Sequence, residues 1–128
     1  SSTNGGSSYD AGASDYSYGN MMMEDGGTPQ NDNSNAATHI NLIGGTYSGI
    51  GSAAGELGVR GTIKIYGAGS AASKTTVLGN VSGENSISRL VGSTIFGRRN
   101  AAQDTDAVRF LFSAGNITSG TIRMYGLA

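Results

Sequence analysis

His39 is the single histidine of the chain, so any serine–histidine relay would have to use it. Such a relay needs an imidazole that is oriented by a carboxylate and placed beside a serine. No serine lies in a recognisable nucleophile motif, and the alternating pattern of residues 38–43 puts His39 on the polar face of a short strand. We therefore expect a solvated or hydrogen-bonded structural histidine.

Carboxylates are the second group with possible chemistry, because two carboxyl groups about 5–9.5 Å apart are sufficient for glycoside hydrolysis. The candidates are Glu24, Asp25, Glu56, Glu84, Asp104 and Asp106. None lies in a recognisable catalytic setting, and solvated loop positions account for all of them. We predict that the protein is not an enzyme and has no catalytic residues.

The polar run over residues 25–35 offers carboxylate and amide oxygens that could suit Ca²⁺. Its spacing is not that of an EF-hand, and Asn-rich turns also arise for conformational reasons. The glycines of residues 44–55 lack the strand–helix context of a dinucleotide site. We therefore predict no metal site and no cofactor.

Tyrosine and methionine side chains are better suited to contact than to catalysis. Three consecutive methionines cannot all lie on one face of a strand, so at least one must point outward as adaptable contact surface. Tyrosine suits half-buried faces, where its ring packs and its hydroxyl stays hydrated. The predicted subunit interface comprises Tyr9, Tyr16, Tyr18, Met21, Met22 and Met23. Core filling by the methionines and stacking of the tyrosines on sugars are the alternatives.

Composition limits the partners. The 128 residues suit one domain, and a net charge of −1 with 13% charged residues gives no electrostatic footprint for nucleic acid. No stretch approaches the run of about 18 apolar residues that a membrane-spanning helix needs. Cysteine is absent, so stability must come from the core or from neighbouring chains.

The 22 glycines punctuate short runs with a period of two, which indicates strands joined by tight turns. Residues 1–19 lack the apolar content to fold alone, so we divide the chain into an extended arm or linker, 1–19, and a β domain, 20–128. A first strand is possible at 16–23, and residues 25–35 form a predicted loop. Further strands are predicted at 38–43, 61–67, 74–78, 87–91, 93–96, 106–113 and 120–127.

Two segments resemble each other. Residues 61–67 (GTIKIYG) and 120–126 (GTIRMYG) share one pattern at a spacing of 59. We predict two equivalent strands that bury Ile63, Ile65, Ile122 and Met124. No window shows a helical stripe, so the predicted fold is all-β with less than about one-tenth helix. Because each strand needs only one apolar face, we expect an antiparallel, jelly-roll-like β-sandwich with an extended N-terminal arm.

Residues 107–127 (AVRFLFSAGNITSGTIRMYGL) resemble a recurrent ending of bacteriophage structural proteins of the tail-fibre, head-fibre and minor-capsid type. In that family a strand ending in "IRF" precedes an "SSGN" turn and then a "GTI-basic-x-YG" strand. These places are filled here by Arg109-Phe110, by residues 113–116 (SAGN) and by residues 120–126. The resemblance extends over residues 38–128 and is weakest in 68–104.

The resemblance implies a virion β-sandwich, often oligomeric. The expected function is that of a phage structural protein, a head-decoration, head-fibre or tail component, located in the virion. Homo-oligomer formation or contact with other virion proteins is expected, with the N-terminal arm running along a neighbour. The alternative is a receptor- or glycan-binding module of a tail fibre, with a host surface glycan as its partner.

Overall fold

The computed structural model describes residues 1–43 and 49–126, and in this part of the chain the fold is all-β. Five strands form one antiparallel sheet in the order β2-β1-β5-β4-β3, and the described residues contain no helix. The strands are β1 (Tyr16–Glu24), β2 (Gln30–Ala37), β3 (Val59–Tyr66), β4 (Lys74–Glu84) and β5 (Leu90–Ala102). The all-β antiparallel prediction is confirmed, whereas the second sheet of a sandwich is not seen among the described residues.

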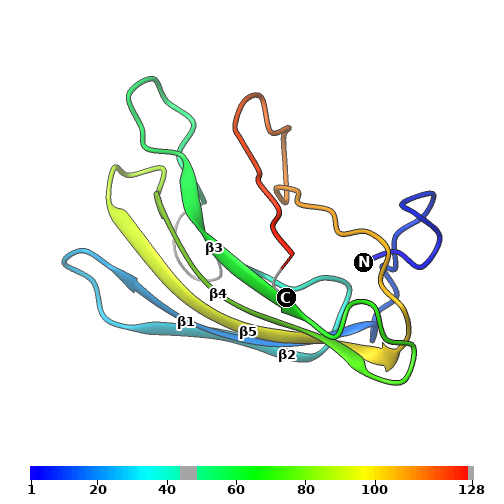
Figure 1. Cartoon of the computed structure of the whole chain (residues 1–128). Coiled ribbons are helices and arrows are strands. Elements are labelled where there is room, and N and C mark those ends of the chain that lie inside the picture. The colour runs from blue at the N-terminus through cyan, green and yellow to red at the C-terminus, as the bar shows by residue number, and fades with distance from the viewer. Residues whose placement is uncertain (44–48, 127–128) are drawn as a thin grey trace.

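The central strand β5 shows how the two faces of the sheet differ. From Val91 to Arg99 every second residue is buried, and nearly all of those between are exposed. Since successive side chains of a strand point to opposite faces, the buried set defines an inner face and the exposed set an outer face. Figure 1 shows that the sheet is curved and that the N-terminal segment and the described segment after β5 lie on its concave side, which is the inner face.

The core lies on the inner face. Its buried apolar side chains are Tyr16, Met22, Val81, Val91 and Ile95. Strands β2 and β3 are opposite edges, so the chain between them crosses the sheet, and the described parts of this connection lie on the inner face. The Ile40 side chain takes the space that a Cβ at Gly97 would enter, and Ile50 forms an isolated bridge with Asn85.

Two predictions for residues 25–43 were wrong. Residues 30–35, predicted as loop, belong to β2, and residues 38–43, predicted as a strand, have no ladder partner. Side-chain bonds explain why a sequence rich in turn formers pairs here. Asn20 Oδ1 accepts a hydrogen bond from the Asp32 backbone N–H at 3.1 Å, and the Tyr18 hydroxyl donates to Asp32 Oδ2 at 3.0 Å. Tertiary context therefore overrides local propensity.

The other strands of the first hundred residues follow the period-two pattern. The predicted strands at 16–23, 61–67, 74–78 and 93–96 all fall on observed strands, although β4 and β5 are longer than predicted. Residues 87–89 do not form a strand. They belong to the turn between β4 and β5, where Ser88 has a φ of 59°.

The C-terminal predictions were wrong. Residues 106–113 form no strand beyond an isolated bridge between Ala107 and Ser2, and residues 120–126 are not in a strand. Ile122 is 66% exposed and Met124 is 77% exposed, whereas Ile63 and Ile65 are half-buried as inner-face residues of β3. The pattern specifies two faces but not a neighbour, and a strand needs a neighbour to form its ladder. Leu127 lies outside the described residues.

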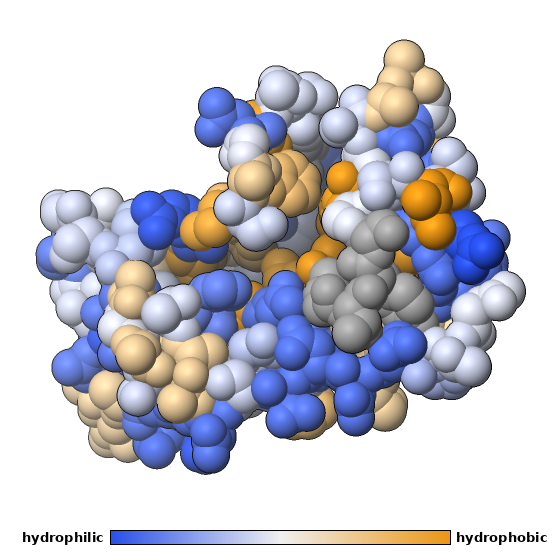
Figure 2. Space-filling model, turned by 180° about the vertical axis from the view of Figure 1, so that it is seen from behind, coloured by the Kyte–Doolittle hydropathy of each residue, from blue (hydrophilic) through white to orange (hydrophobic). Residues whose placement is uncertain are grey.

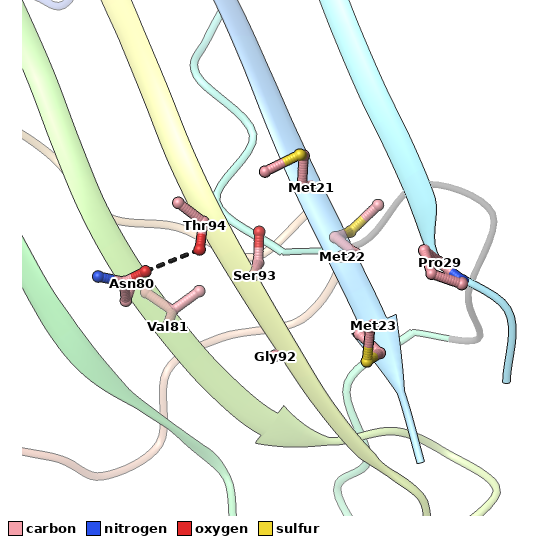
Figure 3. Close-up of a pocket in the computed structure, with 9 residues that line it drawn as sticks. All are labelled: Met21, Met22, Met23, Pro29, Asn80, Val81, Gly92, Ser93 and Thr94. Carbon is pink, nitrogen blue, oxygen red and sulfur yellow. Dashed lines mark hydrogen bonds between the residues drawn. The ribbon is translucent and has the colours of Figure 1, made fainter. Parts of the chain in front are cut away.

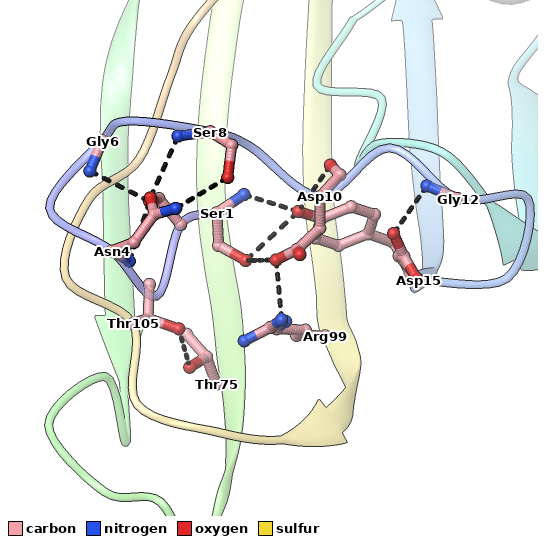
Figure 4. A network of polar contacts seen from close by, with 12 residues as sticks. Ser1, Asn4, Gly6, Ser8, Asp10, Gly12, Asp15, Thr75, Arg99 and Thr105 are labelled. Atoms are coloured by element: carbon pink, nitrogen blue, oxygen red, sulfur yellow. Dashed lines mark hydrogen bonds and ion pairs between the residues drawn. The ribbon is translucent and has the colours of Figure 1, made fainter.

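The N-terminal segment folds back onto its own sheet, and β1 begins at Tyr16, inside the range 1–19 expected for the arm. Ser2 is buried and exchanges backbone hydrogen bonds of 2.9 and 2.8 Å with Ala107 and Asp106. Asp10 Oδ2 lies 2.6 Å from Nη2 of Arg99 on β5 (Figure 4). These contacts fix the segment at one end of the inner face.

Candidate functional site

The outer face of the sheet carries large apolar side chains that the described residues leave uncovered. Met21 is 67% exposed, Met23 59%, Phe96 57% and Leu78 43%. Phe96 pairs with Leu78 on one side and with Gly19 on the other, and its ring lies over Gly19. Met21 and Met23 follow Gly19 on the same face of β1, opposite Thr94 and Gly92, so the four side chains lie on adjacent strands of one face. We call Met21, Met23, Leu78 and Phe96 the outer patch.

A shallow depression of about 460 Å³ lies between the strands at one end of the outer patch. Its rim includes Met21 and Met23 of β1 and Asn80 of β4 (Figure 3). Gly92 has no side chain and no atom within 4 Å of the position that a Cβ would take, which leaves the depression open in the middle. An apolar side chain from another surface could enter here without displacing the sheet.

Polar groups accompany the outer patch. The Thr94 hydroxyl donates a hydrogen bond of 2.8 Å to Asn80 Oδ1 beside the depression. Arg98 and Lys64 are exposed on the outer face of β5 and β3. An apolar centre beside polar groups is the arrangement found at protein interfaces.

The structure separates the three predicted interface methionines. Met21 and Met23 point outward and belong to the outer patch, whereas Met22 is 2% exposed and belongs to the core. The prediction that at least one methionine points outward is confirmed.

The three predicted interface tyrosines lie on the concave side. Tyr16 is buried, and its hydroxyl donates a hydrogen bond of 3.2 Å to the Asp10 carbonyl. Tyr9 is half-buried, with the guanidinium of Arg109 4.7 Å from its ring centroid. Burial raises the pKa of Tyr16 and of Tyr18, and the hydrogen bond to Asp32 raises that of Tyr18 further. Tyr47, a candidate for sugar stacking, lies outside the described residues.

The residues considered for catalysis are distributed over several elements of the fold. His39 is exposed, and its Nδ1 is 2.9 Å from the Thr38 hydroxyl. Glu24 is buried, where it accepts a hydrogen bond from Asn85 Nδ2 and pairs with Arg89 Nη1 at 3.2 Å. No group of three or more His, Asp or Glu side chains that could hold a metal ion occurs within residues 1–43 and 49–126. The same residues include no helix long and apolar enough to cross a membrane.

Sequence reasoning missed Leu78 and Phe96 as surface residues. A signal for them exists, because Val77-Leu78 and Ile95-Phe96 are consecutive apolar pairs within strands. Neighbouring residues of a strand lie on opposite faces, so one member of each pair must leave the core side. The same argument was applied only to the methionines.

Comparison with protein-family models, with curated proteins and with solved structures finds no match to this chain.

Proposed function

We propose that the protein is a structural subunit of a bacteriophage particle, a head-decoration, head-fibre or tail component, that assembles through the outer patch. The observation that carries the assembly part of the proposal is the contiguous apolar surface of Met21, Met23, Leu78 and Phe96. Scattered exposed apolar residues are ordinary, but a contiguous patch is typical of an interaction surface. The virion part rests on the resemblance of residues 38–128 to phage structural proteins.

The proposal includes the second layer of a sandwich. Two sheets pack face to face about 10 Å apart through their apolar faces. The outer patch of one subunit, packed against that of a second, would form such a layer between chains. Full burial of a Met, Leu or Phe side chain contributes roughly 1.5–3 kcal/mol, so a few such residues per subunit give a substantial driving force.

The proposed path of the N-terminal arm along a neighbour stays a prediction. Within one chain the segment is held by the Asp10–Arg99 pair and by the backbone bonds of Ser2. An arm that passes to a neighbour would have to form the same contacts there. Protease cleavage within residues 1–12, compared between the particle and the free chain, tests this: equal rates would contradict it.

Sedimentation of the double variant Met21→Ser/Met23→Ser tests assembly. We expect the wild-type chain to self-associate and the variant to shift toward monomer with a dissociation constant raised about tenfold or more, since about 1.4 kcal/mol corresponds to a factor of ten. The matched control is Leu57→Ser, which removes an apolar side chain of similar exposure from the connection before β3, outside the outer patch, and should leave association unchanged. A wild-type chain that stays monomeric at high concentration would contradict assembly through this face.

Density-gradient purification of particles from infected cells tests the virion part. The chain is expected to co-sediment with the particles, and its presence only in the soluble fraction would overturn that assignment. Specific glycan binding by a monomeric chain would favour a receptor-binding module instead.

A further inference from the structure

The C-terminal segment, residues 107–126, has the sequence of a strand but no strand partner. Among the described residues, those from 110 to 126 make no hydrogen bond to one another or to the rest of the described chain. Val108 and Phe110 are half-buried, whereas the large apolar side chains from Leu111 onward are exposed, and Ile122, Met124 and Tyr125 are 66%, 77% and 75% exposed. Figure 2, which views the molecule from behind, shows a hollow in the surface with hydrophobic residues inside it.

The same seven-residue pattern forms a strand elsewhere in this protein. Residues 61–66 of the first copy lie in β3, where Ile63 and Ile65 face inward and Thr62, Lys64 and Tyr66 face outward. Residues 120–126 repeat the pattern with Ile122 and Met124 in the inward positions. The second copy therefore has the side-chain pattern of an edge strand, but in the single chain it is not paired with a neighbouring strand.

Strand β3 offers that edge. It pairs with β4 on one side and is the last strand in the sheet order. An edge strand presents a row of unpaired backbone N–H and C=O groups and is a template for strand addition. Over its eight residues β3 has no proline and no bulge that would block such pairing.

We propose that the C-terminal segment of one copy adds antiparallel to β3 of a second copy, with Arg123 opposite Thr62 and Ile122 opposite Ile63. This inference rests on the proposed function, because it is one of the contacts by which subunits associate. All neighbouring strands of the sheet pair antiparallel. Antiparallel pairing is also slightly more stable per residue than parallel pairing. The side-chain period then requires Ile122 to extend the inner apolar face.

Charge favours this register over the two that are shifted by two residues. In the shifted registers Arg123 lies opposite Lys64 or opposite Arg60, and like charges directly opposite each other are destabilising. In the proposed register Arg123 faces the neutral Thr62, and Tyr125 faces Arg60, a pair that can form a cation–π contact.

The length of the segment favours a second copy over the segment's own β3. The segment begins at Ala107, which the backbone bonds with Ser2 hold in place. Nineteen further residues can span up to about 60 Å when extended, whereas a domain of this size has a radius of gyration of about 14 Å. The segment is thus long enough to reach β3 of a neighbouring subunit, and in the single chain it does not pair with its own β3.

Disulfide trapping between singly substituted chains tests the pairing. The protein has no cysteine, so Thr62→Cys in one chain and Arg123→Cys in a second, longer tagged chain can be joined only between molecules. Both side chains are exposed, so neither substitution should affect folding, which circular dichroism checks. The control replaces Thr62→Cys by Ile63→Cys, which points to the opposite face. Because disulfide geometry is specific, we expect about tenfold more mixed dimer from the first pair than from the control.

Two outcomes would overturn the proposal. One is the absence of the mixed dimer above the control level. The other is an intramolecular disulfide in the double variant Thr62→Cys/Arg123→Cys that forms equally at all dilutions, which would place the segment on its own β3. The proposed function fails separately: if the chain is absent from particles, or if Met21→Ser/Met23→Ser leaves association unchanged, the trapped pair still stands.

Discussion

The ring of Phe96 on β5 lies over Gly19 on β1. The two residues are directly paired in the sheet, and a Cβ at position 19 would overlap the ring. An aromatic ring that covers a cross-strand glycine hides backbone that would otherwise be exposed and is itself held flat against the sheet. Because Gly19 has no side chain, it leaves the space that the Phe96 ring, the largest side chain of the outer patch, occupies.

Gly19→Ala is expected to displace the Phe96 ring and to lower the free energy of unfolding by about 1–3 kcal/mol, the usual cost of overpacking. Gly92→Ala is the matched control, since a Cβ there meets nothing within 4 Å. Urea denaturation measures both. In a Phe96→Ala background the cost of Gly19→Ala should largely disappear, and an undiminished cost in that background would refute the explanation.

Asn85→Ala is expected to destabilise the turn between β4 and β5 by about 2–3 kcal/mol, because it removes a fully buried amide that satisfies several partners. Asn85 Oδ1 accepts from the backbone N–H groups of Ile87 and Arg89 at 3.1 and 2.9 Å, and Nδ2 donates to buried Glu24. Asn80→Ala, an exposed asparagine of β4, should cost well under half as much. Thermal unfolding of the two variants compares them, and equal losses would show that the buried amide has no special role.

Asp10→Ala is expected to cost about 2–3 kcal/mol, somewhat less than breaking a fully buried ion pair because Asp10 is partly exposed. The Arg99 side chain is 6% exposed, and its Nη1 already has no hydrogen-bond partner among the described residues. Limited proteolysis should then cut residues 1–15 faster than in wild type. The control is Asp104→Ala at an exposed position, and a cleavage rate that Asp10→Ala leaves unchanged would show that the pair does not hold the segment.

Alkaline pH is expected to destabilise the protein through Tyr18. Burial and the hydrogen bond to Asp32 raise the pKa of its hydroxyl above the ordinary value of 10.0, so the folded state favours the protonated form. The contribution of this raised pKa to the free energy of unfolding is fully present below pH 10 and is lost as the pH rises through the folded-state pKa of Tyr18. Denaturant unfolding between pH 8 and 11 should show a shallower decline for Tyr18→Phe than for wild type. Some decline should remain, because burial also raises the pKa of Tyr16, and identical slopes would contradict the role of Tyr18.

Period-two alternation was a good guide where a strand has a neighbour nearby in sequence. It placed Ile63 and Ile65 on the inner face of β3 and required an outward methionine in β1. It failed at Ile122 and Met124, because alternation assigns faces without supplying the adjacent strand. Composition failed at β2, where the bonds of Asp32 to Tyr18 and Asn20 support an edge strand that local preference opposes.

The candidate site was only partly predictable, because local patterns do not specify which strands lie side by side. Two of its members, Met21 and Met23, follow from the impossibility of burying three consecutive methionines on one face. Leu78 and Phe96 become neighbours of the methionines only through the order β1-β5-β4, which no local pattern specifies. Tyr16 and Tyr18 lie on the other side of the sheet because they are an odd number of residues away from Met21 and Met23 in the same strand, a consequence of alternation.

The split among the three methionines makes the outer patch sensitive to oxidants. Peroxide reaches exposed thioethers first, and each sulfoxide turns an apolar side chain into a polar one. Met21, Met23 and the exposed Met124 would be converted, whereas the buried Met22 would be protected within the core. Oxidation would thus make the methionine part of the outer patch polar while Leu78 and Phe96 stay apolar, and methionine sulfoxide reductases would restore the thioethers.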